Sequence, residues 1–190
     1  MEIYLIRHTT PQIEKGICYG QADIPLSKTF QEEASLLSMQ LPQNLDAWYS
    51  SPLSRCYRLT EILAKHMVPS TDHRLLEMNF GDWEMKKWDE INPEALAKWM
   101  NDFVNVAVPE GENFISLNQR VNEFMNDLIK TPHQKVAIVT HGGIIKSFVA
   151  NILGLSLTDA FKITFDYASV TKVILHRDSS YCQLIYSNRV

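Results

Sequence analysis

Short apolar runs alternate with segments of helical periodicity along this chain of 190 residues. Residues 3–6 and residues 136–139 are unbroken apolar runs. Such runs are typical of strands that are buried on both faces of a parallel sheet. Residues 46–49 and 72–76 are predicted as short strands, and residues 170–176 and 181–186 as a terminal hairpin joined by residues 177–180.

Four segments between these strands have apolar residues at helical spacing. Ser27 is predicted to cap the first helix, which ends at Pro42, and Ser51 to cap the second, with Pro52 in its first position. Residues 114–128 and 144–153 are predicted as two further helices, the last one closed by Gly154. The inward faces of the first two helices are predicted to be Phe30, Ala34, Leu37 and Leu41, and Leu53, Cys56, Thr60, Leu63 and Met67.

Strands that alternate with helices before a final hairpin predict an α/β fold. We expect a single domain over residues 1–190, a three-layer sandwich whose central sheet is mixed but mostly parallel. Residues 82–112 differ from the rest, because three of the four tryptophans lie between Trp83 and Trp99. We expect a helical, cap-like insertion here, with the tryptophans as packing residues rather than as a platform that stacks on bases.

Composition limits the partners of the protein. The chain carries 18 Lys and Arg against 22 Asp and Glu, a net charge of −4, so no general positive field would attract nucleic acid. No apolar stretch is long enough to span a bilayer, and the run before Arg7 is too short for a signal peptide, so we expect a cytoplasmic protein with no membrane partner. Cys18, Cys56 and Cys182 form no CxxC pair, which predicts reduced thiols rather than a disulfide framework or a metal cluster.

The chemistry-bearing residues follow the predicted strands. Arg7 and His8 come directly after the first apolar run, His141 and Gly142 after the second, and Arg55 lies near the start of the helix that follows residues 46–49. Strand ends of this kind meet at the edge where open α/β sheets bind ligands. Helix N-termini and guanidinium groups bind anions, phosphate above all, whereas the arginines would repel a divalent cation. The pattern predicts metal-free phosphate chemistry without a cofactor, on a small-molecule phosphate monoester.

Phosphoryl transfer needs a nucleophile and an acid. A neutral histidine can form a covalent phosphoenzyme, and the pattern alone favours His8 over His141 only slightly. The acid is predicted to be a carboxylate near the edge of the sheet, with Glu77 as the first choice and Asp82 and Glu84 as alternatives. A bound phosphate dianion would raise the pKa of such a carboxyl group, which suits an acid at neutral pH.

Three motifs resemble those of the histidine phosphatase (phosphoglycerate mutase-like) superfamily, and the resemblance covers essentially the whole chain. Residues 5–9 resemble its RHG signature, residues 51–55 its second phosphate-binding element, and residues 140–143 the segment of its second histidine. Within the superfamily, residues 76–85 are similar to the alpha-ribazole phosphatases, and Tyr19 and residues 25–27 also fit. Those enzymes remove the 5′-phosphate of alpha-ribazole phosphate during assembly of the cobalamin nucleotide loop.

The resemblance implies a role for each site residue. His8 would become phosphorylated, and Glu77 would protonate the leaving alkoxide and later activate water. Arg7, Arg55, His141 and the backbone N–H of Gly142 would hold the phosphoryl oxygens.

The chain departs from the family pattern at three positions. Thr9 replaces a glycine, Glu14 stands where an asparagine is frequent, and Pro11 stands where a hydroxyl side chain is common. Other functions also remain open: a broad-specificity sugar-phosphate phosphatase, a phosphoglycerate mutase-type phosphotransferase, or a phosphate-binding module without activity. The intact set of catalytic residues speaks against the last of these.

Overall fold

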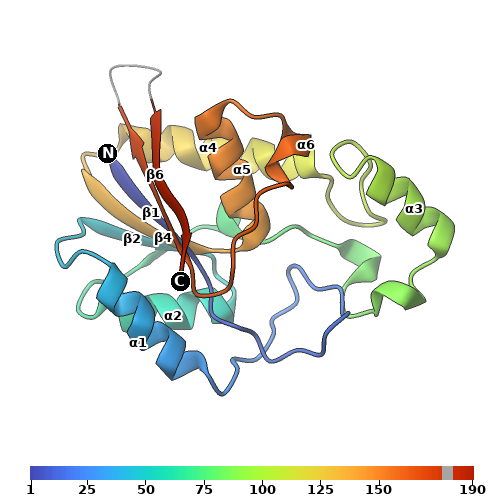
Figure 1. Ribbon diagram of the computed structural model, residues 1–190, viewed down its shortest axis with the longest axis horizontal. Coiled ribbons are helices and arrows are strands. Elements are labelled where there is room, and N and C mark those ends of the chain that lie inside the picture. Colours follow the sequence, from blue (N-terminus) through green and yellow to red (C-terminus); the bar gives the residue numbers. More distant parts are fainter. Residues whose placement is uncertain (177–181) are drawn as a thin grey trace.

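A six-stranded sheet in the order β3-β2-β4-β1-β5-β6 forms the centre of the structure (Figure 1). The structure is a computed structural model that describes residues 1–176 and 182–190. The neighbouring strands β3, β2, β4 and β1 pair in parallel, and β5 pairs antiparallel with both β1 and β6. The predicted mixed, mostly parallel sheet is therefore confirmed. The strands are β1 (Glu2–Arg7), β2 (Ala47–Ser50), β3 (Ser70–Thr71), β4 (Lys135–Thr140), β5 (Val170–Leu175) and β6 (Cys182–Arg189).

Helices cover both faces of the sheet. Helices α1 (Phe30–Gln40) and α2 (Ser54–Ala64) lie on one face, and α4 (Phe114–Lys130) and α5 (Gly142–Leu153) lie on the other (Figure 1). Helix α3 (Pro93–Asn101) lies away from the sheet, and α6 (Leu157–Ala160) follows α5. No helix in the described part of the chain is long and apolar enough to cross a membrane. Short 3₁₀ turns complete the elements: η1 (His73–Leu75), η2 (Gly81–Trp83) and η3 (Trp88–Glu90).

Side chains along β1 alternate between two covered faces of the sheet, which explains its unbroken apolar run. Ile3 and Leu5 pack in the core with α4 and α5, while Tyr4 and Ile6 pack in the core with α1 and α2. Successive residues of a strand point to opposite faces, so a central strand needs apolar residues at every position. The same holds for β4, which pairs with β1 on one side and β2 on the other.

Several helix boundaries differ from those predicted. Thr29, not Ser27, occupies the N-cap of α1. Ser51 does not cap α2, because Leu53 at the N-cap is extended (ψ 139°) and the helix begins at Ser54. Most of the predicted inward faces of α1 and α2 are confirmed as buried. Met67, however, lies beyond α2 and is 38% exposed.

The predicted strand over residues 72–76 is wrong. Only residues 70–71 pair with β2, and η1 follows because the carboxylate of Asp72 accepts the N–H of Arg74. The terminal hairpin is confirmed, although β6 continues to Arg189. Residues 177–180, predicted to join its strands, and Tyr181, predicted to begin the second strand, lie outside the described residues.

Both ends of the tryptophan-rich segment meet at one place. Asp82 N–H donates to Pro109 C=O (3.0 Å), and Glu112 N–H donates to Asn79 C=O (2.9 Å). Between these contacts the aromatic rings form edge-to-face and stacked pairs with centroids 5.7–6.4 Å apart. The cap-like insertion over about residues 82–112 stays a prediction. The rings in the cluster are those of Phe80, Trp83, Trp88 and Trp99.

Candidate active site

The two predicted histidines meet at the carboxyl edge of the sheet. His8 follows β1 and His141 follows β4, and their ring centroids are 5.1 Å apart in an edge-to-face contact. His8 Nδ1 lies 2.7 Å from the carbonyl oxygen of Thr9. Because a carbonyl can only accept, Nδ1 carries the proton and Nε2 keeps its lone pair. His141 is fully buried, and its Nε2 lies 2.8 Å from Ser51 Oγ.

Both imidazoles are held in the neutral form. Burial lowers the pKa of His8 well below its usual value, and the charges of Arg55 and Arg7 lower it further. Burial is also the main reason that the pKa of His141 lies well below its usual value. A neutral imidazole with a free lone pair is the state that a nucleophile requires.

Loops fix the two predicted arginines through carbonyl groups. Arg55 is fully buried and donates to the carbonyl oxygens of Gly20 (2.5 Å) and Ala22 (2.7 Å). Arg7 donates to the carbonyl oxygen of Phe165. The Nε atoms of both arginines are buried without a hydrogen-bond partner in the described part of the chain.

The two arginines have no negative partner in the part of the chain that the structure describes. In the described residues neither Arg7 nor Arg55 forms an ion pair with a carboxylate. Buried charges are costly unless they are paired. Gly142, the first residue of α5, lies against Arg7, since a Cβ there would be 3.4 Å from Arg7 Cζ. Two guanidinium groups and a helix N-terminus thus surround a place suited to a phosphate dianion.

Glu77 faces the same cavity. Its carboxylate accepts the N–H groups of Met78 (3.0 Å) and Gly143 (3.1 Å). A Cβ on Gly143 would lie 2.4 Å from Glu77 Oε1, so the glycine permits this close approach. Arg120 fixes the backbone by donating to the carbonyl oxygens of Leu76 (2.6 Å) and Glu77 (3.0 Å).

The alternative acids lie elsewhere. Asp82 is exposed, and neither Asp82 nor Glu84 lines the cavity. The carboxylate of Glu84 is already occupied by four backbone N–H groups, at 2.9–3.1 Å, which explains its presence without a chemical role. The four groups belong to Gly20, Gln21, Ala22 and Phe80.

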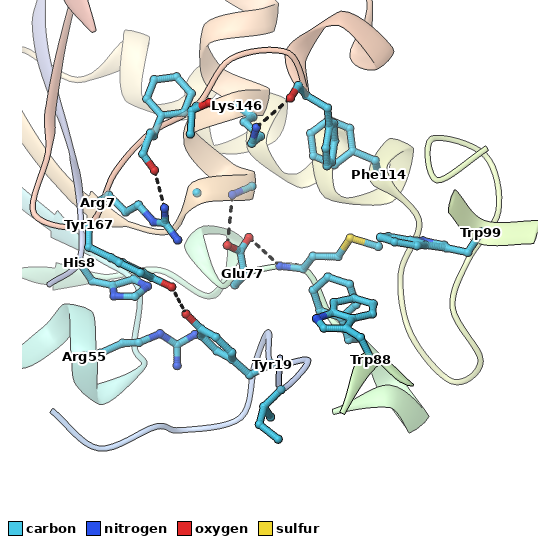
Figure 2. A pocket seen from close by; sticks show the side chains of 18 residues that line it. Arg7, His8, Tyr19, Arg55, Glu77, Trp88, Trp99, Phe114, Lys146 and Tyr167 are labelled. Carbon is cyan, nitrogen blue, oxygen red and sulfur yellow. Dashed lines mark hydrogen bonds between the residues drawn. The ribbon is translucent and has the colours of Figure 1, made fainter. Parts of the chain in front are cut away.

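The cavity has a polar end and an aromatic end (Figure 2). Its volume is about 330 Å³. The polar end of the cavity is lined by Arg7, His8, Arg55, Glu77 and Gly142. His141 is buried and does not line the cavity. The aromatic walls are formed by Tyr19, Phe80, Trp88, Trp99, Phe114, Phe161, Phe165 and Tyr167.

Two of the three departures from the family pattern, Glu14 and Thr9, do not obstruct this site. Glu14 has a side chain that is 70% exposed and pairs with Lys87 (3.4 Å), so its charge does not oppose an anion in the cavity. Thr9 has a negative φ, so the turn after His8 does not depend on a glycine.

Sequence reasoning missed four residues around the site. Ser51 was taken for a helix cap, and Arg120 lies on α4, far along the chain from the Glu77 backbone that it holds. Tyr167 lines the cavity from the loop before β5, and no sequence pattern marks it. Lys146 had a usable signal, because it lies four residues after Gly142 on α5, on the same helix face.

Fold and site together define a phosphatase of the α/β class. A family model of the histidine phosphatase superfamily (branch 1) matches residues 3–188. This chain belongs to that superfamily and is a phosphatase. In the described residues, no group of three or more histidine, cysteine, aspartate or glutamate side chains could hold a metal ion.

Similar proteins carry different names. A Hydrogenobacter thermophilus protein named "Putative phosphoserine phosphatase 2" is 30% identical over 99% of this chain and 95% of its own length. The Escherichia coli adenosylcobalamin/alpha-ribazole phosphatase is 30% identical over 82% of this chain and 80% of its own length. The crystal structure of the alpha-ribazole phosphatase from Shigella flexneri superposes with a TM-score of 0.91, at 26% identity, over 99% of this chain and 96% of that one.

The two buried neutral histidines predict a loss of stability in mild acid. Below a pH of about 6.5 the unfolded chain binds protons that the folded chain resists, because burial lowers both folded pKa values. The free energy of unfolding should therefore fall between pH 6.5 and 5.5, by up to about 1.4 kcal/mol per pH unit for each histidine.

Urea denaturation of the wild type, His141→Gln and a control, His66→Gln, would measure this slope. His66 is exposed, so its variant should keep the wild-type slope, whereas His141→Gln should have a smaller one. Equal slopes in all three proteins would contradict the burial of a neutral His141.

Proposed function

We propose that this phosphatase works through a phosphohistidine at His8 and that its substrate is alpha-ribazole 5′-phosphate. The observation that carries the mechanism is the state of His8. Its ring is neutral, Nδ1 is engaged by the Thr9 carbonyl, and it lines a cavity together with Arg7 and Arg55. Nε2 is then the free nucleophilic atom beside two cations that neutralise the phosphate.

The proposed reaction has two halves. In the first, Nε2 of His8 attacks phosphorus, the P–N bond forms as the ester P–O bond breaks, and Glu77 gives its proton to the leaving alkoxide. In the second, the Glu77 carboxylate takes a proton from water as the water oxygen attacks phosphorus. The P–N bond breaks, its electron pair returns to Nε2, and inorganic phosphate leaves.

The remaining polar groups stabilise the charge during transfer. Arg7, Arg55 and the N–H of Gly142 hold the phosphoryl oxygens at the N-terminus of α5. His141 joins them by exchanging its hydrogen bond to Ser51 for one to the phosphoryl group. Arg7, Arg55 and the N–H of Gly142 are held in place before substrate arrives, so these three donors need little reorganisation in the transition state.

The aromatic end of the cavity supports the choice of substrate. Trp88 and Trp99 line it opposite the phosphate-binding end (Figure 2), and the Phe80 ring contacts both of them edge to face. The base of alpha-ribazole is a flat, apolar bicyclic ring, which aromatic side chains bind by stacking and by edge contacts. The similarity to the Escherichia coli and Shigella flexneri phosphatases supports the same substrate.

A second candidate substrate is O-phosphoserine. The Hydrogenobacter relative covers nearly the whole chain, and Lys146 places a half-buried ammonium group in the cavity. Lys146 Nζ contacts the carbonyl oxygens of Phe161 (3.4 Å) and Ile163. An ammonium group there could pair with the carboxylate of phosphoserine, a group that alpha-ribazole phosphate lacks.

Kinetics on a substrate panel would test the choice of substrate. With chelator present, kcat/KM for alpha-ribazole 5′-phosphate should exceed that for O-phosphoserine and for small sugar phosphates at least tenfold. A preference for phosphoserine that Lys146→Met abolishes would establish the second candidate instead. Equal values for all substrates would indicate a broad-specificity enzyme, and transfer of phosphate to an added alcohol would indicate a mutase-type activity.

Leaving-group dependence tests the role of Glu77. Glu77→Gln should lower kcat by about 10²–10⁴ on an alkyl phosphate, whose leaving group needs a proton. The loss should be smaller on p-nitrophenyl phosphate, whose leaving group departs unprotonated. Asp82→Asn is the matched control, since Asp82 is exposed and outside the cavity. Equal losses on both substrates would remove Glu77 from the role of acid.

A further inference from the structure

Two tyrosines from different loops meet at the phosphate-binding end of the cavity. Tyr19 lies in the loop after β1 and Tyr167 in the loop before β5, and their hydroxyl oxygens are 2.5 Å apart. Figure 2 shows the two rings reaching toward one another, joined through these hydroxyl groups. Both side chains line the cavity, and the Tyr167 ring centroid is 5.4 Å from that of His8.

Each tyrosine also covers one of the phosphate-binding arginines. Arg7 Cζ lies 3.9 Å from the Tyr167 ring centroid, and Arg55 Cζ lies 5.5 Å from the Tyr19 ring centroid. The loop of each tyrosine supplies the carbonyl groups that hold the same arginine. Gly20 follows Tyr19 and accepts from Arg55, and Phe165 precedes Tyr167 by two residues and accepts from Arg7. The hydroxyl pair therefore joins the two loops that position the arginines.

A count of hydrogens leaves one donor unused. A pair of phenols has two O–H groups, and their mutual hydrogen bond uses one hydrogen. No acceptor for the second hydrogen is present in the described residues, since the Tyr19–Tyr167 contact is the one hydrogen bond that either hydroxyl makes there. Burial and the contact with Tyr167 raise the pKa of Tyr19, so the hydroxyl keeps its proton at neutral pH despite the nearby arginines. A protonated donor without an acceptor, beside two arginines that lack an anion, indicates where an anion binds.

We propose that the Tyr19–Tyr167 pair is a further phosphate-binding element, which donates its unused O–H to the phosphoryl group held by Arg7 and Arg55. The proposal rests on the phosphate site of the proposed function but not on the identity of the substrate. The first hydroxyl polarises the second through their shared hydrogen bond, which strengthens the donor.

Inorganic phosphate is the probe, because it occupies the phosphate site whatever the leaving group is. Its inhibition constant would be measured against p-nitrophenyl phosphate for Tyr19→Phe, Tyr167→Phe and the double variant. Each phenylalanine keeps the ring over its arginine and removes only the hydroxyl. Tyr4→Phe is the matched control, because it removes a phenol that donates to Glu2 (2.9 Å) outside the cavity.

The expected result is an inhibition constant about tenfold or more higher in the double variant and in at least one single variant, with the control unchanged. This is the loss expected for one hydrogen bond to a charged group. A merely structural role would lower thermal stability and leave the inhibition constant unchanged. If the double variant does not fold, the two single variants decide, and the proposal fails if both of them stay within twofold of the wild type.

Arg55→Gln separates this proposal from the proposed function. If phosphate inhibition is lost in Arg55→Gln but unchanged in every tyrosine variant, the tyrosine pair is not a phosphate-binding element. If phosphate inhibits Arg55→Gln with the wild-type inhibition constant, the phosphate site itself has been placed wrongly, and the tyrosine proposal fails with it.

Discussion

The parallel pairing of β1 with β4 is the constraint on which the site depends. Arg7 lies opposite Thr140 in this register, so the next residues along both strands, His8 and His141, emerge side by side. The His8 N–H donates to the Thr140 carbonyl (3.0 Å), which extends the pairing to the first histidine itself. A shift of one residue would turn every side chain of β1 to the other face of the sheet. The register of β1 against β4 therefore sets the distance between the two imidazoles.

Around this core the protein buries positive charge without burying its counter-charge. Arg55 is completely buried, and the groups that hold it are the neutral carbonyls of Gly20 and Ala22. The Glu84 carboxylate accepts the N–H groups of the same loop, so it stabilises the loop without pairing with the arginine. A site with two arginines and neutral histidines is costly when empty and is stabilised by a bound dianion. A phosphate bound at the proposed site would supply the negative charge that the loops leave out.

Local pattern predicted much of the site and none of its long-range supports. Most of the strands, the histidines after them and Arg55 could be predicted because each depends on a few neighbouring residues. Ser51 looked like a helix cap in sequence, but its partner is His141, 90 residues away. Tyr167 and Arg120 could not be predicted for the same reason, since their roles depend on contacts between loops and helices distant in the chain. The predicted start of α2 was wrong because the backbone conformation around residues 51–53, rather than the capping preference of serine, decides where this helix begins.

Identification of the phosphorylated atom tests the central claim most directly. The enzyme would be mixed with radiolabelled alpha-ribazole 5′-phosphate, or with p-nitrophenyl phosphate if that substrate is not turned over, and quenched in alkali during the first turnover. The expected product is an alkali-stable, acid-labile phosphate on the peptide that contains His8, attached at Nε2. A phosphate on any other side chain, or turnover by His8→Asn at the wild-type rate, would contradict it.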